Sequence, residues 1–96
     1  MGIIDKLNKN FESRVRLGIM SILMVNEWID FTEMKTLLDI TDGNLASHSA
    51  ALEKSEYIKI KKEFVGKKPK TSYKVSEKGR AAFKEHLLNL EKLMKS

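Results

Sequence analysis

Apolar residues recur at helical spacing through the first quarter of the chain. Three of them follow one another every four residues and predict a short amphipathic helix over 3–11: Ile3, Leu7 and Phe11. Residues 13–26 repeat the pattern more densely, and because apolar positions almost surround this second helix, it should lie at the centre of the fold. Gly18 inside it lowers the helix propensity, which indicates a close contact with another helix.

Two shorter helical patterns follow, separated by only a few residues. Thr32 is expected to cap the first of them, and Thr41 or Asp42 the second. The residues just before Thr32 should form an extended link. Two short helices joined this tightly form a helix-turn-helix, which we place at 33–54.

The period of the apolar positions then changes to two. The stretch "YIKIKKEF" places Ile58, Ile60 and Phe64 on one face of a half-buried strand, with lysines on the other face. The stretch "TSYKV" alternates in the same way and is predicted to be the return strand. Between them, "VGKKPK" holds a glycine and the only proline of the chain. We therefore predict a β-hairpin over 57–75, with a tip longer than two residues.

The last part of the chain returns to helical spacing. Ser76 is expected to cap a final helix over 77–95. Its apolar residues recur at spacings of four, three and four, like the seam of a coiled coil: Phe83, Leu87, Leu90 and Met94. A domain of 96 residues offers few internal partners for so long a seam. We therefore expect the two terminal helices to pair with those of a second copy about a twofold axis.

These elements predict a mainly α fold with a small β-hairpin, in which residues 1–96 form a single domain. Its core would span 12–75, with terminal helices at 3–11 and 77–95 outside the core. Regular structure throughout fits a composition with one proline, five glycines and 42% hydrophobic residues.

The positive charge is concentrated in the predicted hairpin. The formal net charge is +5, yet residues 57–74 hold seven lysines and one glutamate, a balance of +6. Residues 1–56 have a balance of −3 and residues 75–96 a balance of +2. Such an uneven field suggests a polyanionic partner, although a solubilising lysine surface explains the same charges equally well.

One long segment, "GNLASHSAALEKSEYIKIKKEFVGKKPKTSYKVSEKGR" at residues 43–80, resembles the small winged helix-turn-helix regulators of bacteria and archaea in the MarR/ArsR-like group. The piece "FVGKKPKTSY", followed by "EKGR", is the most specific part, and the flanking helices extend the similarity over most of the chain. The resemblance implies a winged helix-turn-helix with additional N- and C-terminal dimerisation helices. In such proteins the second helix of the motif enters the DNA major groove, and the hairpin, called the wing, contacts the backbone or the minor groove.

Carried over by position, the resemblance implies DNA-binding residues on the second helix and the wing: Gly43, Asn44, Ser47, His48, Lys54, Lys67, Lys68 and Lys70. An asparagine can pair with adenine and a serine with several base edges, whereas lysine adds charge more than specificity. The alternative is that these polar residues merely solvate an exposed helix and a hairpin tip. Arg14 and Arg16 suit either a phosphate contact or a role on the helix surface.

The dimer interface implied by the terminal helices comprises seven apolar residues: Ile3, Leu7, Phe11, Phe83, Leu87, Leu90 and Met94. His86 lies beside this seam, and we expect it to be structural or interfacial rather than a metal ligand.

The chain departs from the family pattern at the second helix. Ser49 stands where an apolar residue is usual, and Ala50 and Ala51 stand where basic residues are usual. The helix is therefore nearly uncharged, so the wing must supply most of the positive charge for phosphates. Glu56 replaces a usual glycine just after the helix, which predicts a strained turn.

Composition and motifs exclude several classes of functional site. The absence of cysteine excludes disulfides, thiolate metal sites and thiol redox sensing. The sequence has no nucleophile–histidine–carboxylate order, phosphate loop or metal-ligand spacing, so we expect no enzyme, no metal and no cofactor. The longest apolar run is too short to span a membrane and no signal-peptide pattern is seen, which predicts a cytoplasmic protein. Whether a small-molecule effector binds in a pocket near Trp28 is left open by the sequence.

The leading hypothesis is a homodimeric transcriptional regulator, a repressor that binds double-stranded DNA at a palindromic operator. The alternative is a winged helix that binds an acidic protein partner, which the uncharged helix surface at Ala50 and Ala51 would favour.

Overall fold

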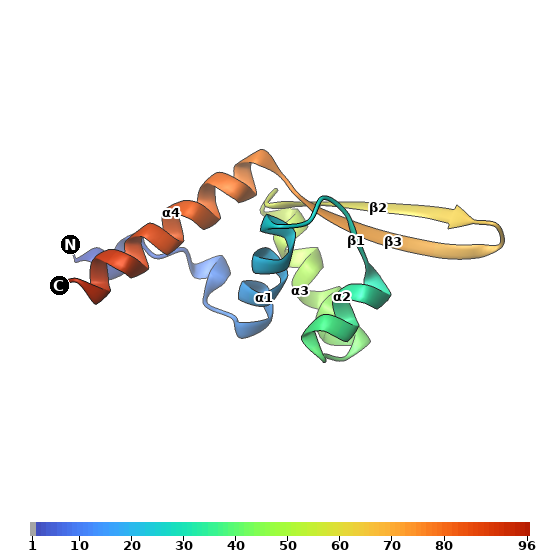
Figure 1. The fold of residues 1–96 in the computed structure, drawn as a ribbon, viewed down its shortest axis with the longest axis horizontal. Helices are drawn as coiled ribbons and strands as arrows, with labels where there is room; N and C mark the ends of the chain where they lie inside the picture. Colours follow the sequence, from blue (N-terminus) through green and yellow to red (C-terminus); the bar gives the residue numbers. More distant parts are fainter. Residues whose placement is uncertain (1) are drawn as a thin grey trace.

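Helices dominate the fold, and a three-stranded sheet projects from them. The computed structural model describes residues 2–96. With η denoting a 3₁₀ helix, the elements in chain order are η1 (Ile3–Lys6), η2 (Lys9–Phe11), α1 (Arg14–Met24), β1 (Ile29–Asp30), α2 (Phe31–Leu38), α3 (Asp42–Lys54), β2 (Ile58–Val65), β3 (Lys68–Val75) and α4 (Glu77–Met94). The molecule measures 53 × 25 × 21 Å because the hairpin β2–β3 and helix α4 extend in opposite directions from the central helices (Figure 1). The predicted mainly α winged-helix fold is confirmed.

Side-chain caps fix where the helices begin. Thr41 caps α3 by accepting a hydrogen bond from the Asn44 amide at 3.1 Å, and Ser76 caps α4 by accepting one from the Gly79 amide at 2.9 Å. Both caps agree with the predictions. Helix α2 differs, because Asp30 rather than Thr32 is its cap. The Asp30 carboxylate accepts the Glu33 amide at 2.8 Å, and the helix therefore starts two residues earlier than predicted.

The predicted N-terminal helix over 3–11 is wrong, because the segment forms the two separate turns η1 and η2. Leu7 and Asn8 between them are extended. The Asn8 side chain accepts the Asn10 amide at 2.9 Å, while the Asn8 amide donates to His86 Nδ1 at 3.0 Å. These local and tertiary hydrogen bonds replace the helical ones and interrupt the helix.

The sheet is antiparallel with strand order β1–β3–β2. The short strand β1, expected only as an extended link, pairs with Ser72 and Tyr73 of β3. Strands β2 and β3 pair along their whole length, up to Val65 opposite Lys68, so the turn holds only Gly66 and Lys67. The prediction of a longer tip is therefore wrong. Gly66 has a φ of +66°, a left-handed conformation that two-residue hairpin turns need, and this lets the pairing continue to the end.

Pro69 consequently lies inside β3, opposite Phe64. A proline removes a ladder donor and is confined to open strand edges or to positions whose nitrogen points away from the neighbouring strand. Strand β1 pairs only with Ser72 and Tyr73, so from Ser72 toward the hairpin tip that edge of β3 is open. Position 69 therefore tolerates proline.

The core fills the space between α1, α3 and the base of the hairpin. Its fully buried side chains include Ile19, Leu23 and Leu45. Gly18 confirms the predicted close contact, since a Cβ there would lie 2.7 Å from Leu38 Cδ2 of helix α2. The predicted inward position of Phe64 is wrong: its side chain is 75% exposed, because the hairpin projects beyond the helices that would cover it.

Phe11 and Phe83 also belong to this core, so their prediction as dimer-interface residues is wrong. Their rings meet edge to face with centroids 5.2 Å apart, and they are 0% and 3% exposed. The spacing of Phe83 with later residues of α4 concealed this role, because the first turns of α4 cover the body of the protein and the last turns do not.

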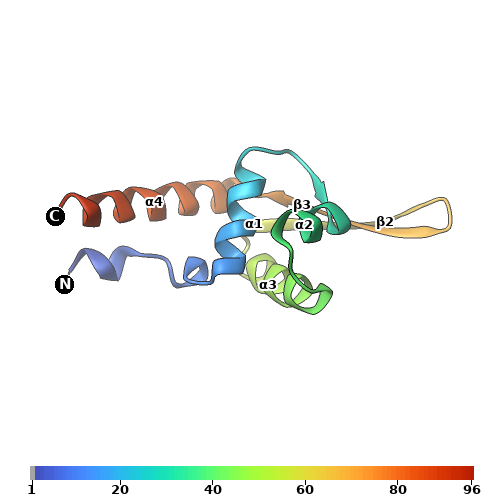
Figure 2. The same cartoon turned by 60° about the horizontal axis from the view of Figure 1, so that its bottom comes forward.

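Helix α4 and the N-terminal segment form an arm, by which we mean residues 2–10 and 84–94. The two segments of the arm run side by side away from the core (Figure 2). Asn89 Nδ2 donates to the Lys6 carbonyl at 3.2 Å, and His86 accepts the Asn8 amide, so polar side chains join the two segments. Within residues 2–96, no helix is both long and apolar enough to cross a bilayer.

Candidate DNA-binding surface

Helix α3 presents one buried and one open face. Leu45, Ser49 and Leu52 point into the protein and are buried. Four of the predicted DNA-binding residues lie on the exposed surface of the same helix: Gly43, Asn44, Ser47 and Lys54. A Cβ at Gly43 would meet nothing within 4 Å, so the backbone there is open to close approach. The helix thus offers its small and polar side chains to a partner.

His48 is half-buried and held by a neighbour from another helix. Its Nδ1 accepts a hydrogen bond from Nε of Arg16 in α1 at 3.0 Å. With Nδ1 as the acceptor, the proton of the neutral ring is on Nε2, which is then available as a donor. The pair also brings the Arg16 guanidinium to the flank of α3. Sequence spacing did not reveal this contact, since the two residues lie 32 positions apart.

Ser49 is accommodated in the core despite its hydroxyl. It is 2% exposed, and its Oγ donates to the Ala46 carbonyl at 3.2 Å. The pKa of the nearby Tyr73 is raised by burial, and the Ser49 side chain partly lowers it again. A serine therefore replaces the usual apolar residue without leaving a buried polar group unsatisfied.

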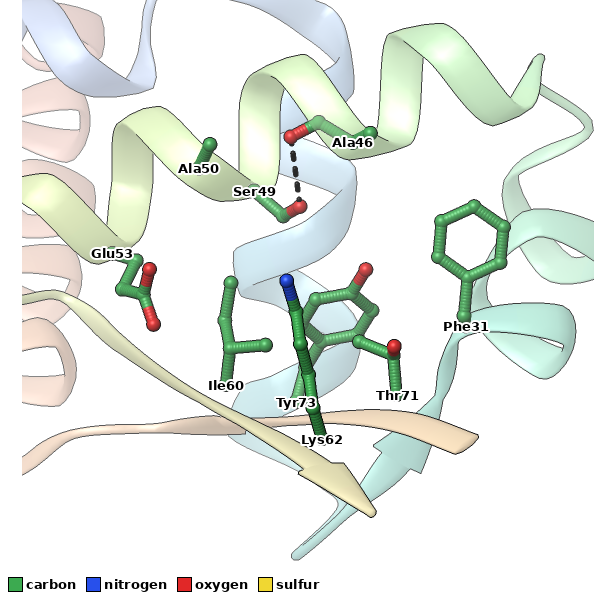
Figure 3. Close-up of a pocket in the computed structure, with 9 residues that line it drawn as sticks. All are labelled: Phe31, Ala46, Ser49, Ala50, Glu53, Ile60, Lys62, Thr71 and Tyr73. Atoms are coloured by element: carbon green, nitrogen blue, oxygen red, sulfur yellow. Dashed lines mark hydrogen bonds between the residues drawn. The ribbon is translucent and has the colours of Figure 1, made fainter. Parts of the chain in front are cut away.

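A groove of about 490 Å³ separates α3 from the hairpin (Figure 3). Ala46, Ala50 and Glu53 line its helix side, and Ile60 and Lys62 line its hairpin side. The side chains of Lys62 and Ile60 rise from the sheet toward α3 (Figure 3). Lys62 is thus a cation near the exposed face of α3. It was not among the site residues predicted from the sequence, although the period of two places it on the same face as Ile60.

The wing lysines are exposed and, among residues 2–96, form no ion pairs. Lys67 lies in the turn, and Lys68 and Lys70 follow it on β3. Among residues 2–96, no carboxylate lies within 4.0 Å of any of these three ammonium groups. The wing predicted from the charge balance therefore presents unpaired positive charge.

On the outer face of the hairpin base, by contrast, lysines are engaged. Lys61 Nζ lies 4.3 Å from the centroid of the Trp28 ring, and Lys74 Nζ lies 5.6 Å from it. Lys74 also pairs with Glu27 at 3.7 Å. The Trp28 ring, near which the sequence allowed an effector pocket, thus contacts the ammonium groups of two lysines.

The electrostatic division between the helix and the wing follows from these positions. Helix α3 carries Asp42 and Glu53 against Lys54, whereas the exposed part of the wing has only Glu63 among its acids. Within residues 2–96, no cluster of three or more histidine or carboxylate side chains forms a metal site. The excess of positive charge on the wing suits a polyanion.

Comparison with known proteins agrees with this geometry. Residues 15–94 match the family described as winged helix DNA-binding domain. An uncharacterized protein of Methanocaldococcus jannaschii is 36% identical over 88 residues, which cover 92% of this chain and 96% of that protein. The structure of a transcriptional regulator homologue from Pyrococcus horikoshii superposes with a TM-score of 0.89 at 29% identity, covering 99% of this chain and 96% of that one.

Two more distant structures share the fold. NadR in complex with 4-hydroxyphenylacetate has a TM-score of 0.74 at 17% identity, over 97% of this chain and 65% of the NadR chain. An ArsR family transcriptional regulator has a TM-score of 0.61 at 15% identity, over 98% of this chain and 92% of that one. The chain therefore belongs to the winged helix DNA-binding domain family, with the fold of the MarR- and ArsR-type transcription regulators.

Proposed function

We propose that this protein is a sequence-specific transcriptional regulator that binds double-stranded DNA as a homodimer and represses transcription at a palindromic operator. The observation that carries the proposal is the pairing of an open, polar α3 surface with a hairpin of unpaired lysines. Helix and wing project from the same body, so one duplex can contact both.

Direct readout would come from the exposed face of α3 in the major groove. Asn44 is suited to adenine, Ser47 to several base edges, and His48 to an acceptor through Nε2. Because α3 is nearly uncharged, these residues would add specificity and little affinity. The wing lysines and Lys62 would neutralise phosphates, which supplies most of the affinity of such complexes.

The homodimer is supported by apolar side chains that the arm leaves exposed. Leu87, Leu88 and Met94 of α4 are 46%, 58% and 79% exposed, and Ile4 beside them is 67% exposed. Several such residues along one narrow arm form an apolar surface that a monomer would leave in water. A twofold axis through the arms would set two α3 helices about 34 Å apart, one turn of DNA.

Repression would follow from occlusion. A dimer with two wings covers its operator and the neighbouring grooves, so it would exclude other proteins from that stretch of DNA. A reporter gene placed behind the selected operator should lose expression when the protein is present. Increased expression would make the protein an activator instead.

The central test is selection of bound duplexes from a genomic fragment pool at low salt, with light scattering on the same complexes. We expect enrichment of a palindrome, two protomers per duplex, and affinity that falls steeply as salt rises. Asn44→Ala should weaken binding to the enriched palindrome about tenfold and leave binding to a scrambled duplex unchanged. The absence of any retarded duplex at low salt would contradict the proposal.

A second candidate function is contact with an acidic protein partner. Its basis is that Ala46 and Ala50, on the α3 side of the groove, are small and uncharged, with Glu53 the one charged residue beside them. This candidate predicts that the wing lysines capture an acidic polypeptide while no duplex binds at low salt, the reverse of the result expected above.

A further inference from the structure

The tip of the wing carries an apolar pair that folding does not explain. Phe64 is 75% exposed and lies directly opposite Pro69 in the register of the hairpin. Residues 61–70 are all exposed, so no core element covers either side chain. Because the tip around them is rich in lysine, this exposed apolar pair is a candidate contact surface.

The pair faces the same side as the groove beneath α3. Side chains alternate along a strand, so Phe64 shares a face with Lys62 and Ile60, and Pro69 with Thr71 and Tyr73. Those four neighbours all line the α3 groove (Figure 3). A duplex held by the exposed face of α3 would therefore lie on the side of the wing to which Phe64 belongs.

The reach of the wing matches the spacing of DNA grooves. From the pair Ile60–Tyr73 to the pair Phe64–Pro69 the strands advance four residues, about 14 Å. Successive major and minor grooves alternate about every 17 Å along one side of a duplex, half of its 34 Å turn. A helix in the major groove would thus leave the wing tip at the adjacent minor groove.

The charge around the pair fits a polyanion rather than an apolar partner. Lys62 precedes Phe64 on its own face, whereas Lys68 and Lys70, next to Pro69 in the sequence, point to the opposite face. A protein or a second copy of this chain that covered Phe64 and Pro69 would bury the Lys62 ammonium at considerable cost. A phosphate beside a minor groove would pair with Lys62 instead.

We propose that Phe64, supported by Pro69, enters the minor groove beside the major-groove site and partly unstacks one base step, which bends the duplex. Phenylalanine and proline are among the side chains that proteins use as such wedges, and bending follows from the lost stacking. The protein would then also select a deformable pyrimidine–purine step about half a turn from the bases that α3 reads. This inference rests on the function proposed above.

The test uses Phe64→Ala and, as a matched control, Val65→Ala. Val65 is the next residue, 58% exposed, and points to the opposite face of the hairpin. Both changes remove an exposed apolar side chain from the tip, so fold stability should change little in either. The probe is a duplex from the selection experiment, end-labelled for energy transfer and carrying 2-aminopurine at the step beneath the wing.

Wild type and Val65→Ala should shorten the end-to-end distance of the duplex and increase 2-aminopurine fluorescence. Phe64→Ala should abolish both signals and bind about tenfold more weakly, with the salt dependence unchanged. Equal bending by Phe64→Ala and wild type overturns the wedge but leaves the regulator intact. Failure of the wild type to bind any duplex overturns both. A change of oligomeric state in DNA-free Phe64→Ala, without a change in bending, identifies the tip as a protein interface and also overturns the wedge.

Discussion

Glu56 holds a backbone conformation that glycine adopts more easily. Its φ is 65°, and it ends α3 in a Schellman arrangement, with the Glu56 amide donating to Glu53 O at 2.8 Å and the Tyr57 amide to Leu52 O at 3.0 Å. Glu56→Gly should therefore relieve strain and raise the free energy of unfolding by up to about 1 kcal/mol, measured by denaturant titration. Loss of the exposed Lys78–Glu56 ion pair, at 3.8 Å, should change the free energy of unfolding little.

Glu53→Gly is the matched control for this prediction. It makes the same chemical change three residues earlier, in the last turn of α3, where the backbone is helical and glycine costs up to about 1 kcal/mol. The two variants should therefore move stability in opposite directions. Equal destabilisation by both would show that the turn at Glu56 is not strained.

His86 makes stability depend on pH. Burial lowers its pKa below the ordinary 6.5, with Glu12 opposing part of the change, and its Nδ1 accepts the Asn8 amide. The unfolded chain binds the His86 proton more readily than the folded protein does. The contribution of neutral His86 to the free energy of unfolding is therefore complete above about pH 6.5, and it is lost as pH falls through the lowered pKa of the folded state. His86→Asn keeps an acceptor for the Asn8 amide and should reduce the loss of unfolding free energy between pH 7 and pH 5. An unchanged loss in the variant would assign the acid sensitivity to carboxylates.

At the scale of single residues, sequence reasoning succeeded where local chemistry decides. The caps at Thr41 and Ser76, the contact at Gly18 and the strained turn at Glu56 all follow from one residue and its immediate neighbours. It failed for Phe64, because alternation says which face a side chain occupies and not how far the strand extends beyond its cover.

Among elements, the wing combines a predicted shape with an unpredicted length. The hairpin and its charge were read from the period of two and the lysines, but the two-residue turn depends on Gly66 at φ +66° and on full pairing up to Lys68. The N-terminal helix failed for the converse reason. Its apolar residues recur at helical spacing, but the hydrogen bond from the Asn8 amide to His86 interrupts the helix. Local periodicity cannot predict a contact between residues 78 positions apart.

The wing lysines should act mainly through charge. Lys67→Ala with Lys68→Ala is expected to weaken binding to every duplex sequence, because phosphates are the same in all of them. Loss of two phosphate contacts should reduce the salt slope of the logarithm of affinity by about 1.8 per wing. Binding titrations at several salt concentrations measure this slope directly.

Lys84→Ala with Lys92→Ala is the charge-matched control, since both lysines are exposed on α4 rather than on the wing. Its salt slope should equal that of the wild type. If this control lowers the slope as much as the wing variant does, the effect belongs to net charge and the wing has no special role.

For the molecule as a whole, elongation separates two surfaces. The wing extends from one side of the core and the arm from the other (Figure 1), so the proposed DNA-binding residues and the exposed apolar residues of α4 do not compete. The seam on α4 was predicted from its spacing, but its division was not: Phe83 entered the core while Leu87 and Met94 stayed exposed. Only the three-dimensional position of the body relative to α4 decides that division.

Leu87→Glu with Met94→Glu should therefore convert a dimer into a folded monomer. Both side chains are already partly in water, at 46% and 79% exposure, so the charges cost little inside one protomer and much at an apolar interface. Light scattering should show half the wild-type mass, with an unchanged thermal midpoint at low protein concentration. Glu85→Lys, which changes an exposed residue about 160° around α4 from Leu87, should leave the mass unchanged.

The same double variant links assembly to DNA binding. A monomer has one α3 and one wing, so its affinity for a palindrome should fall toward that for a single half-site and its salt slope should fall to about half. Shifting the half-sites by five base pairs puts them on opposite sides of the duplex and should weaken wild-type binding without affecting the monomer. A wild type that stays monomeric both free and on DNA would remove the twofold axis from the proposal, and the arm would then need a different partner to cover Leu87 and Met94.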